Sequence, residues 1–171
     1  MSQEKDKLLA HSLADFFNDP LHQNVLIQIL DASRDRHVSL RLVDWICTTY
    51  SKEHRMLFPK SDGSIVDIHS SYKSHLRSYG KSRFDIFRRG KKTTIKCGDK
   101  ELETTLAQLN FIRWLINHQV VDYLETHREE LMHLQKQDTN DENPGESSSK
   151  KPTKRKKGYH LSNLQARVIF E

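Results

Sequence analysis

Apolar residues recur every three or four positions through most of the first 137 residues, and this helical period limits the fold more than any other feature. Leu9, Leu13 and Phe17 begin the pattern, which stops before Asn18-Asp19-Pro20. Pro20 can open a second helix, because the first residue of a helix needs no intrahelical N–H bond. Further helices are expected after Ser39, Ser64 and Thr105, and over residues 120–137. The sequence predicts a mainly α, single helical domain of about five or six helices over residues 1–137.

A small β-hairpin is expected inside this helical domain. Thr93 to Cys97 and Lys100 to Thr104 flank Gly98-Asp99, a pair of residues typical of a tight turn. Thr105 and Gln108 have the spacing of a capping box, in which the threonine hydroxyl accepts a hydrogen bond from the first turn of the next helix. The hairpin is therefore predicted to lead directly into a helix.

The composition changes abruptly at Asp138. Residues 138–158 lack bulky apolar side chains and run from acidic to basic, so a disordered linker is expected there. Its basic part, KKPTKRKK, holds six cations in eight residues, a pattern that suits either a nuclear import receptor or a phosphate backbone. Residues 159–171 end in ARVIFE and are predicted to form a C-terminal strand segment.

Basic residues concentrate between Tyr72 and Lys96. Nine lysines and arginines stand there against one acid, Asp85, giving a local balance of +8, whereas the whole chain carries +5. The stretch predicts a surface that neutralises phosphates, and a solvated basic face is the simpler alternative. Its tyrosines and phenylalanines match the apolar face of a helix and are predicted to belong to the core. The candidate nucleic-acid-binding residues are Lys73, Arg77, Lys81, Arg83, Arg88, Arg89, Lys91 and Lys92, extended by Lys154, Arg155, Lys156 and Lys157 of the linker.

No pattern in the sequence points to catalysis, a metal or a cofactor. No two of the ten histidines are four residues apart, the spacing that places two metal ligands on one helical face. No known nucleophile or phosphate-loop motif occurs, so we expect no enzyme activity, no cofactor and no metal. The two cysteines, Cys47 and Cys97, are predicted to be buried free thiols.

Three segments together resemble an uncharacterised family of small proteins of nucleocytoplasmic large DNA viruses. They are LVDWICTTYSKEH, SSYKSHLRSYGKSRFDIFRR and TTLAQLNFIRWLINHQVVDYLETH. The resemblance covers about the middle half of the chain and implies a viral source, with a role in the virion or in replication. It implies no catalytic residue, because no activity is attached to these segments.

The charge pattern and this resemblance together predict a non-enzymatic viral protein that binds a nucleic-acid backbone without strong sequence preference. DNA is expected more than RNA, in genome organisation, packaging or transcription. The alternative is a minor virion structural protein whose basic stretch meets acidic protein surfaces and whose terminal strand contacts a neighbour. No apolar run approaches the roughly 20 residues of a membrane span. The expected location is therefore intracellular, in the nucleus or viral factory of the host, or in the virion.

Overall fold

The computed structural model describes residues 2–31, 38–60 and 62–141. The predicted linker, its basic run and the terminal strand segment lie outside these residues, apart from positions 138–141. In the described part of the chain, no helix has the length and apolar character that crossing a bilayer requires.

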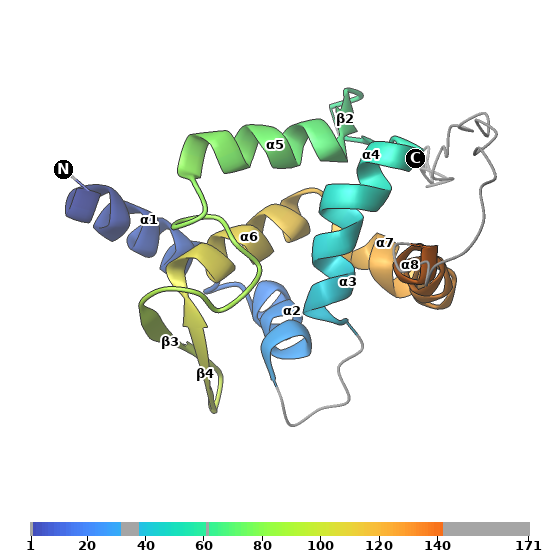
Figure 1. Ribbon diagram of the computed structural model, residues 1–171. Helices are drawn as coiled ribbons and strands as arrows, with labels where there is room; N and C mark the ends of the chain where they lie inside the picture. Colours follow the sequence, from blue (N-terminus) through green and yellow to red (C-terminus); the bar gives the residue numbers. More distant parts are fainter. Residues whose placement is uncertain (1, 32–37, 61, 142–171) are drawn as a thin grey trace, which may run out of the picture.

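The chain folds as one mainly helical unit with two small β-hairpins (Figure 1), which confirms the predicted fold class. Its helices are α1 (Ser2–Phe16), α2 (Pro20–Leu30), α3 (Leu40–Trp45), the π-helix η1 (Ile46–Tyr50), α4 (Ser51–His54), α5 (Ile68–Tyr79), α6 (Leu106–Asn117), α7 (Val120–Thr126) and α8 (Arg128–Asp141). Its strands are β1 (Leu57–Pro59), β2 (Ile65–Asp67), β3 (Lys92–Cys97) and β4 (Lys100–Thr105).

Local capping signals fix several of the boundaries. Asp19 accepts a hydrogen bond from Leu21 N at 2.8 Å, and Pro20 opens α2 as expected. Thr105 Oγ1 accepts from Gln108 N at 3.1 Å and so begins α6, as the Thr105–Gln108 spacing predicts. Gly80 follows α5 with φ of +70°, a conformation that costs glycine little and terminates the helix. These boundaries therefore follow from short-range chemistry.

Two predictions about where helices begin and end are wrong. Ser64 does not cap a helix, because residues 65–67 form β2, which pairs with β1 in the register Phe58↔Val66. The cap of α5 is Asp67, whose side chain accepts from Ser70 N at 2.9 Å. The last helix also differs: it breaks at His127 into α7 and α8, and α8 runs to Asp141 rather than ending near residue 137.

The predicted hairpin forms at β3 and β4, paired antiparallel with Ile95 opposite Leu102. Gly98 sits in its turn with φ of +60°, which glycine adopts without the steric cost that a Cβ brings. Lys92, Lys96, Glu101 and Glu103 lie on the exposed side of the hairpin, whereas Leu102 is buried. One face of the hairpin therefore belongs to the core and the other carries charge.

The core is built around α6, which is buried on most of its sides. Ile112 and Leu115 are completely buried there, and Phe111 is 2% exposed. The aromatic rings of Phe111, Phe84 and Trp114 contact each other at the side that faces α5. Both cysteines are buried and free, as predicted. The helix α6 therefore supplies the platform on which the basic stretch rests.

Candidate nucleic-acid interface

The basic surface comprises the eight predicted cations that lie in the described part of the chain. They are Lys73, Arg77, Lys81, Arg83, Arg88, Arg89, Lys91 and Lys92. They follow the outer side of α5, the basic loop formed by residues 80–91, and the beginning of β3 (Figure 1). The four predicted linker cations, residues 154–157, lie outside the described residues.

One side of helix α5 faces the core and another side carries charge, as the sequence predicts. Tyr72 is 9% exposed and Leu76 and Tyr79 pack against the core, while Lys73 and Arg77 are exposed. The predicted stripe of three cations four residues apart is interrupted, however, because the helix ends at Tyr79. Lys81 therefore does not continue the stripe and instead lines a cavity beside the loop.

The basic loop is held against α6 by buried polar contacts. Asn110 Nδ2 donates to Arg83 O at 2.8 Å, Gln108 Nε2 donates to Ile86 O at 2.7 Å, and Asp85 N donates to Ala107 O at 3.3 Å. Phe84 and Ile86 are each 1% exposed and insert into the core beside these bonds. The loop carries its cations on a fixed backbone, which lowers the conformational entropy that binding would have to remove.

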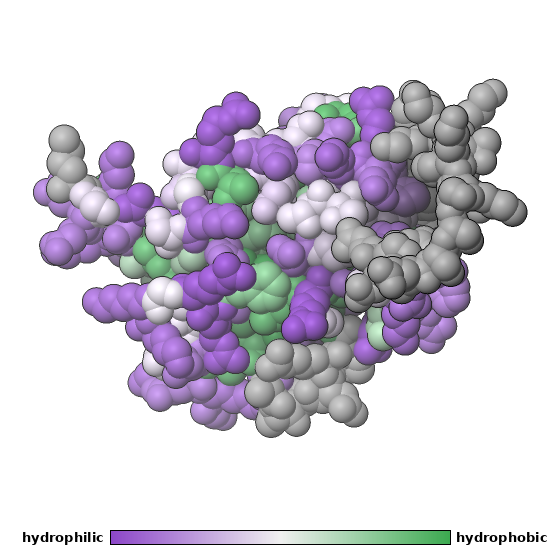
Figure 2. Space-filling model, in the orientation of Figure 1, coloured by the Kyte–Doolittle hydropathy of each residue, from purple (hydrophilic) through white to green (hydrophobic). Residues whose placement is uncertain are grey.

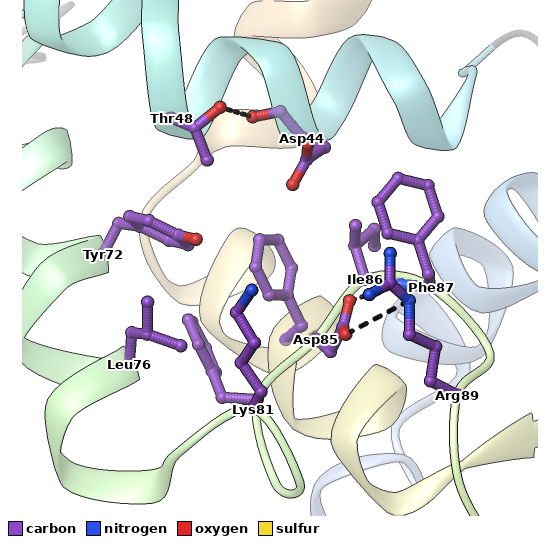
Figure 3. Close-up of a pocket in the computed structure, with 11 residues that line it drawn as sticks. Asp44, Thr48, Tyr72, Leu76, Lys81, Asp85, Ile86, Phe87 and Arg89 are labelled. Carbon is purple, nitrogen blue, oxygen red and sulfur yellow. Dashed lines mark hydrogen bonds and ion pairs between the residues drawn. The ribbon is translucent and has the colours of Figure 1, made fainter.

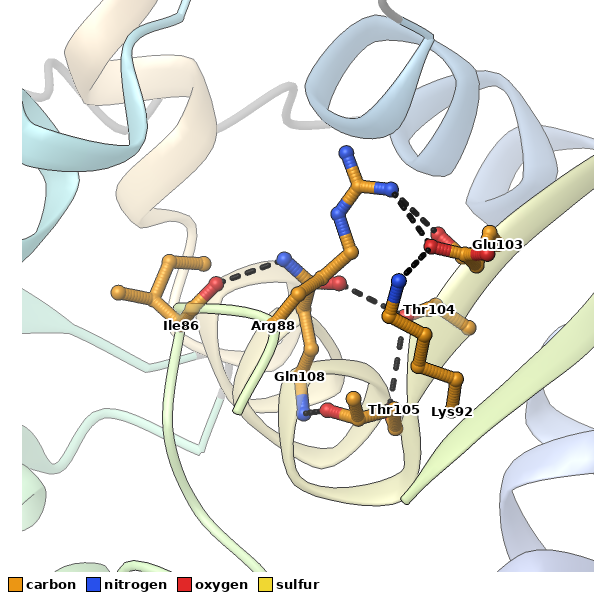
Figure 4. Close-up of polar contacts among 7 residues, drawn as sticks. All are labelled: Ile86, Arg88, Lys92, Glu103, Thr104, Thr105 and Gln108. Atoms are coloured by element: carbon orange, nitrogen blue, oxygen red, sulfur yellow. Dashed lines mark hydrogen bonds and ion pairs between the residues drawn. The ribbon is translucent and has the colours of Figure 1, made fainter. Parts of the chain in front are cut away.

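Half of the basic surface is neutralised within the chain. Arg83 Nε lies 2.5 Å from Asp6 Oδ1, and Arg89 Nε lies 3.8 Å from Asp85 Oδ2. Arg88 and Lys92 share Glu103, with N–O distances of 3.5 and 2.9 Å (Figure 4). The hydrogen bond from Lys92, followed by the charges of Lys92 and Arg88, lowers the pKa of Glu103. These four cations are therefore less available to phosphates than the sequence indicates.

The remaining cations of this surface form no ion pair with any described residue. They are Lys73, Arg77, Lys81 and Lys91. All four are exposed. With β4 included, residues 72–105 contain ten lysines and arginines against four acids, so the local balance is +6. The surface stays strongly basic after its internal pairing.

The charges of the molecule are separated in space. The outer helices α7 and α8 carry six acids against Arg128 and Lys136. Figure 1 shows α7 and α8 on the opposite side of the molecule from the β3–β4 hairpin. An anionic partner is therefore attracted to one side of the molecule and repelled from the other.

Two arrangements in the structure have no signal in the sequence. Asp44 of α3 points into the cavity that Lys81 lines (Figure 3). Ser71 Oγ lies 3.0 Å from His118 Nε2 and accepts a hydrogen bond from Trp114 Nε1 at 3.0 Å. His118 Nδ1 lies 2.9 Å from Trp114 O, so this nitrogen carries the proton and Ser71 donates to Nε2. Both arrangements join residues more than 25 positions apart, which helical spacing cannot reveal.

No group of three or more acidic, histidine or cysteine side chains within the described ranges could hold a metal ion. Burial, ahead of the other causes, lowers the pKa of His118 and keeps the ring neutral, which fits a role in satisfying the Trp114 and Ser71 polar groups.

Comparison with known proteins identifies the family. The sequence matches a family of unknown function, DUF7197, over residues 1–164, and the chain belongs to that family. It is 31% identical over 121 residues to the uncharacterized protein L507 of Acanthamoeba polyphaga mimivirus. That match covers 66% of this chain and 46% of the viral protein, so the chain spans about half the length of this relative. No solved structure matches. The expected resemblance to an uncharacterised giant-virus family is confirmed.

Proposed function

We propose that this member of the DUF7197 family binds a nucleic-acid backbone through its basic surface, without enzymatic activity and without strong sequence preference. The observation that carries the proposal is a set of four exposed cations on α5 and the basic loop that form no ion pair with any residue the structure describes: Lys73, Arg77, Lys81 and Lys91. Cations held in this way contact phosphates and release condensed counterions, and phosphate contacts carry no sequence information.

The internal ion pairs change which residues should be tested. Arg88 and Arg89 are adjacent candidates in the predicted basic stretch, and the sequence alone would make reversal of their charges a natural test. In the structure these arginines pair with Glu103 and Asp85, so their reversal would place like charges together and disturb the fold. The unpaired Lys73, Arg77 and Lys91 are better targets, because their replacement breaks no described ion pair.

The test is fluorescence anisotropy with mixed-sequence duplex DNA across a salt series. The triple variant Lys73→Gln, Arg77→Gln, Lys91→Gln is expected to bind at least about tenfold more weakly at low salt and to reduce the magnitude of the log–log salt slope by up to about 3, at about 0.9 per lost phosphate contact. The matched control neutralises Lys7, Lys52 and Lys136, three exposed lysines of α1, α4 and α8 that form no described ion pair.

Equal weakening of the triple variant and its control would contradict the proposal, because binding would then depend on net charge alone. Comparing the full chain with a chain that ends at Asp141, the end of α8, measures how much residues 142–171 contribute to DNA binding. If only the full chain binds, the site belongs to the basic linker, with Lys154, Arg155, Lys156 and Lys157, and not to the folded surface. If neither chain binds DNA at low salt, the alternative of an acidic protein partner in virion assembly takes its place.

A further inference from the structure

A cavity opens between α3, the adjoining π-helix η1, α5 and the basic loop, and Phe111 of α6 lines it as well (Figure 3). Its volume is about 200 Å³. This is below the roughly 300–1,000 Å³ of sites that enclose an entire small molecule. Figure 2 shows apolar side chains in the middle of this face with hydrophilic side chains around them. The cavity is therefore large enough for one ring system, and the rest of such a ligand would stay outside it.

Asp44 is an acceptor without a described partner at this cavity. Its backbone carbonyl accepts from Thr48 Oγ1 at 2.7 Å, but its carboxylate forms no described hydrogen bond or ion pair. Burial, and then the nearby charge of Asp85, raises the pKa of Asp44. No fully buried side-chain polar atom of the described residues lacks a partner, so the carboxylate of the half-buried Asp44 is still accessible. Asp44 lines the cavity, which is where this carboxylate points in Figure 3. It is positioned to accept hydrogen bonds from a ligand.

Cations stand across the cavity from this carboxylate. Lys81 lines the cavity and forms no described ion pair, and Arg89 lines it while pairing weakly with Asp85 at 3.8 Å. In Figure 3 the Lys81 amine and the Asp44 carboxylate both point into the space between them. Lys81 and Arg89 also belong to the basic surface. A molecule whose phosphate contacts these two residues can therefore place a neighbouring group in the cavity.

Aromatic rings form the apolar part of the wall. Phe84 lies 4.6 Å from Phe111 and 6.0 Å from Tyr72, between ring centroids, and all three rings line the cavity. Phe87 is half-buried on the loop side, with the Arg89 guanidinium 5.4 Å from its centroid. Flat apolar walls beside convergent polar groups suit a planar heterocycle.

We propose that the cavity receives one unstacked base of a single-stranded nucleic acid, with Asp44 accepting hydrogen bonds from the base edge and Lys81 and Arg89 contacting the adjacent phosphate. This proposal rests on the proposed function, keeps its sequence-independent phosphate contacts, and adds the kind of strand and a preference at the one base that enters the cavity. Proteins read unpaired bases on their Watson–Crick edges in this manner. Guanine is the base that presents two adjacent N–H donors, N1–H and the exocyclic amine, to the two oxygens of a carboxylate. The site is therefore expected to favour guanine.

The test compares short oligothymidylates that carry one central guanine, one central abasic position or neither, measured by fluorescence anisotropy. The protein is expected to bind the guanine strand about tenfold more tightly than the others, which is within the range for a good bidentate base contact. Asp44→Asn places an N–H donor beside the base edge and should remove this preference, so that the guanine strand binds no more tightly than plain oligothymidylate. Asp122→Asn, on the exposed side of α7, is the charge-matched control and should retain it.

Asp44→Asn is expected to fold, because burial already disfavours the charged carboxylate at this position. A thermal unfolding scan checks this. Lys81→Gln provides a second readout: it should weaken binding to every strand about equally and keep the guanine preference. Absence of a guanine preference in the native protein, or a preference that survives Asp44→Asn, would overturn the inference.

Guanosine monophosphate tests whether the cavity binds a free nucleotide instead of a base within a strand. If it binds in an Asp44-dependent way while the strands show no guanine preference, the single-strand occupant is overturned. Failure of the proposed function has a different signature, which is equal loss of duplex binding by the Lys73, Arg77, Lys91 variant and its lysine control.

Discussion

Several polar side chains of this protein find their hydrogen-bond partners only in the folded structure. Gln108 is completely buried and uses its amide to bind Ile86 O and the hydroxyl of Thr104, which joins the basic loop to the start of α6 (Figure 4). His118 is fixed in one tautomer between Trp114 and Ser71. Such fully satisfied contacts specify one arrangement of neighbouring segments, because a misplaced segment would leave a buried polar group without a partner.

The neutral state of His118 should make stability depend on pH. Its pKa in the folded protein is lower than the ordinary value of 6.5, chiefly through burial. Below pH 6.5 the unfolded chain therefore binds a proton that the folded chain resists, and the free energy of unfolding falls as the pH decreases toward the folded-state pKa. We expect His118→Gln to flatten this slope, by at most about 1.4 kcal/mol per pH unit.

Urea unfolding between pH 5 and 8, where histidine ordinarily changes its charge, measures this effect. His133→Gln is the control, since His133 is exposed on α8 and forms no described hydrogen bond or ion pair. Slopes that are the same for the native protein and His118→Gln would show that the ring is not held neutral by its surroundings.

At the scale of elements, the start of α5 depends on Asp67 rather than on Ser64. The Asp67 carboxylate accepts from Ser70 N at 2.9 Å and also places a negative charge at the positive end of the helix. Asp67→Ala is expected to lower the free energy of unfolding by about 0.5–2 kcal/mol. Ser64→Ala, in the exposed β1–β2 turn, should change it by less than about 0.5 kcal/mol. Chemical denaturation of the two variants compares them directly, and a larger loss for Ser64→Ala would place the cap elsewhere.

The elements differ in how well sequence predicts them, for physical reasons. Boundaries with a local signal, such as Pro20, Gly80 and Thr105, follow from propensity and capping. The β1–β2 hairpin was not predicted, because strands of three residues carry almost no periodicity and depend on packing, with Phe58 only 2% exposed. The π-helix within the run from α3 to α4 has no recognised sequence signal, and its buried residues are Ile46, Cys47 and Tyr50.

The candidate site was predictable only in part. The sequence indicates that Tyr72 to Lys96 is basic and that Tyr72 faces the core, and the fold agrees on Tyr72. The pairing of Lys92 with Glu103 could have been inferred once the hairpin register was known, because the two are diagonal neighbours on one face. The convergence of Asp44 with Lys81 could not, since they come from separate elements that meet only through the packing of α3 and the basic loop against α6.

At the scale of the whole molecule, the proposed binding depends on where charge lies and not on its total. Neutralising Asp122, Glu125 and Glu129 raises the net charge by three, on the outer side of α7 and α8. At physiological salt the Debye length is about 8 Å, so these acids act weakly on a partner at the basic surface. We expect the neutralised variant to bind duplex DNA less than about threefold more tightly. That change is smaller than the loss expected from neutralising Lys73, Arg77 and Lys91.

Anisotropy at several salt concentrations measures both variants in the same way. A gain from the acidic-side variant as large as the loss from the basic-side variant would show that net charge, and not a localised surface, determines binding.

The acidic helices α7 and α8 also have a consequence for many copies of the protein on one polyanion. A copy that places its basic surface on the phosphates turns its acid-rich helices away from them, so the coated strand still presents negative charge to its surroundings. Neighbouring coated strands would then repel one another. A folded domain of this kind would coat a nucleic acid and keep neighbouring coated molecules apart. A uniformly basic protein of similar size would instead condense them.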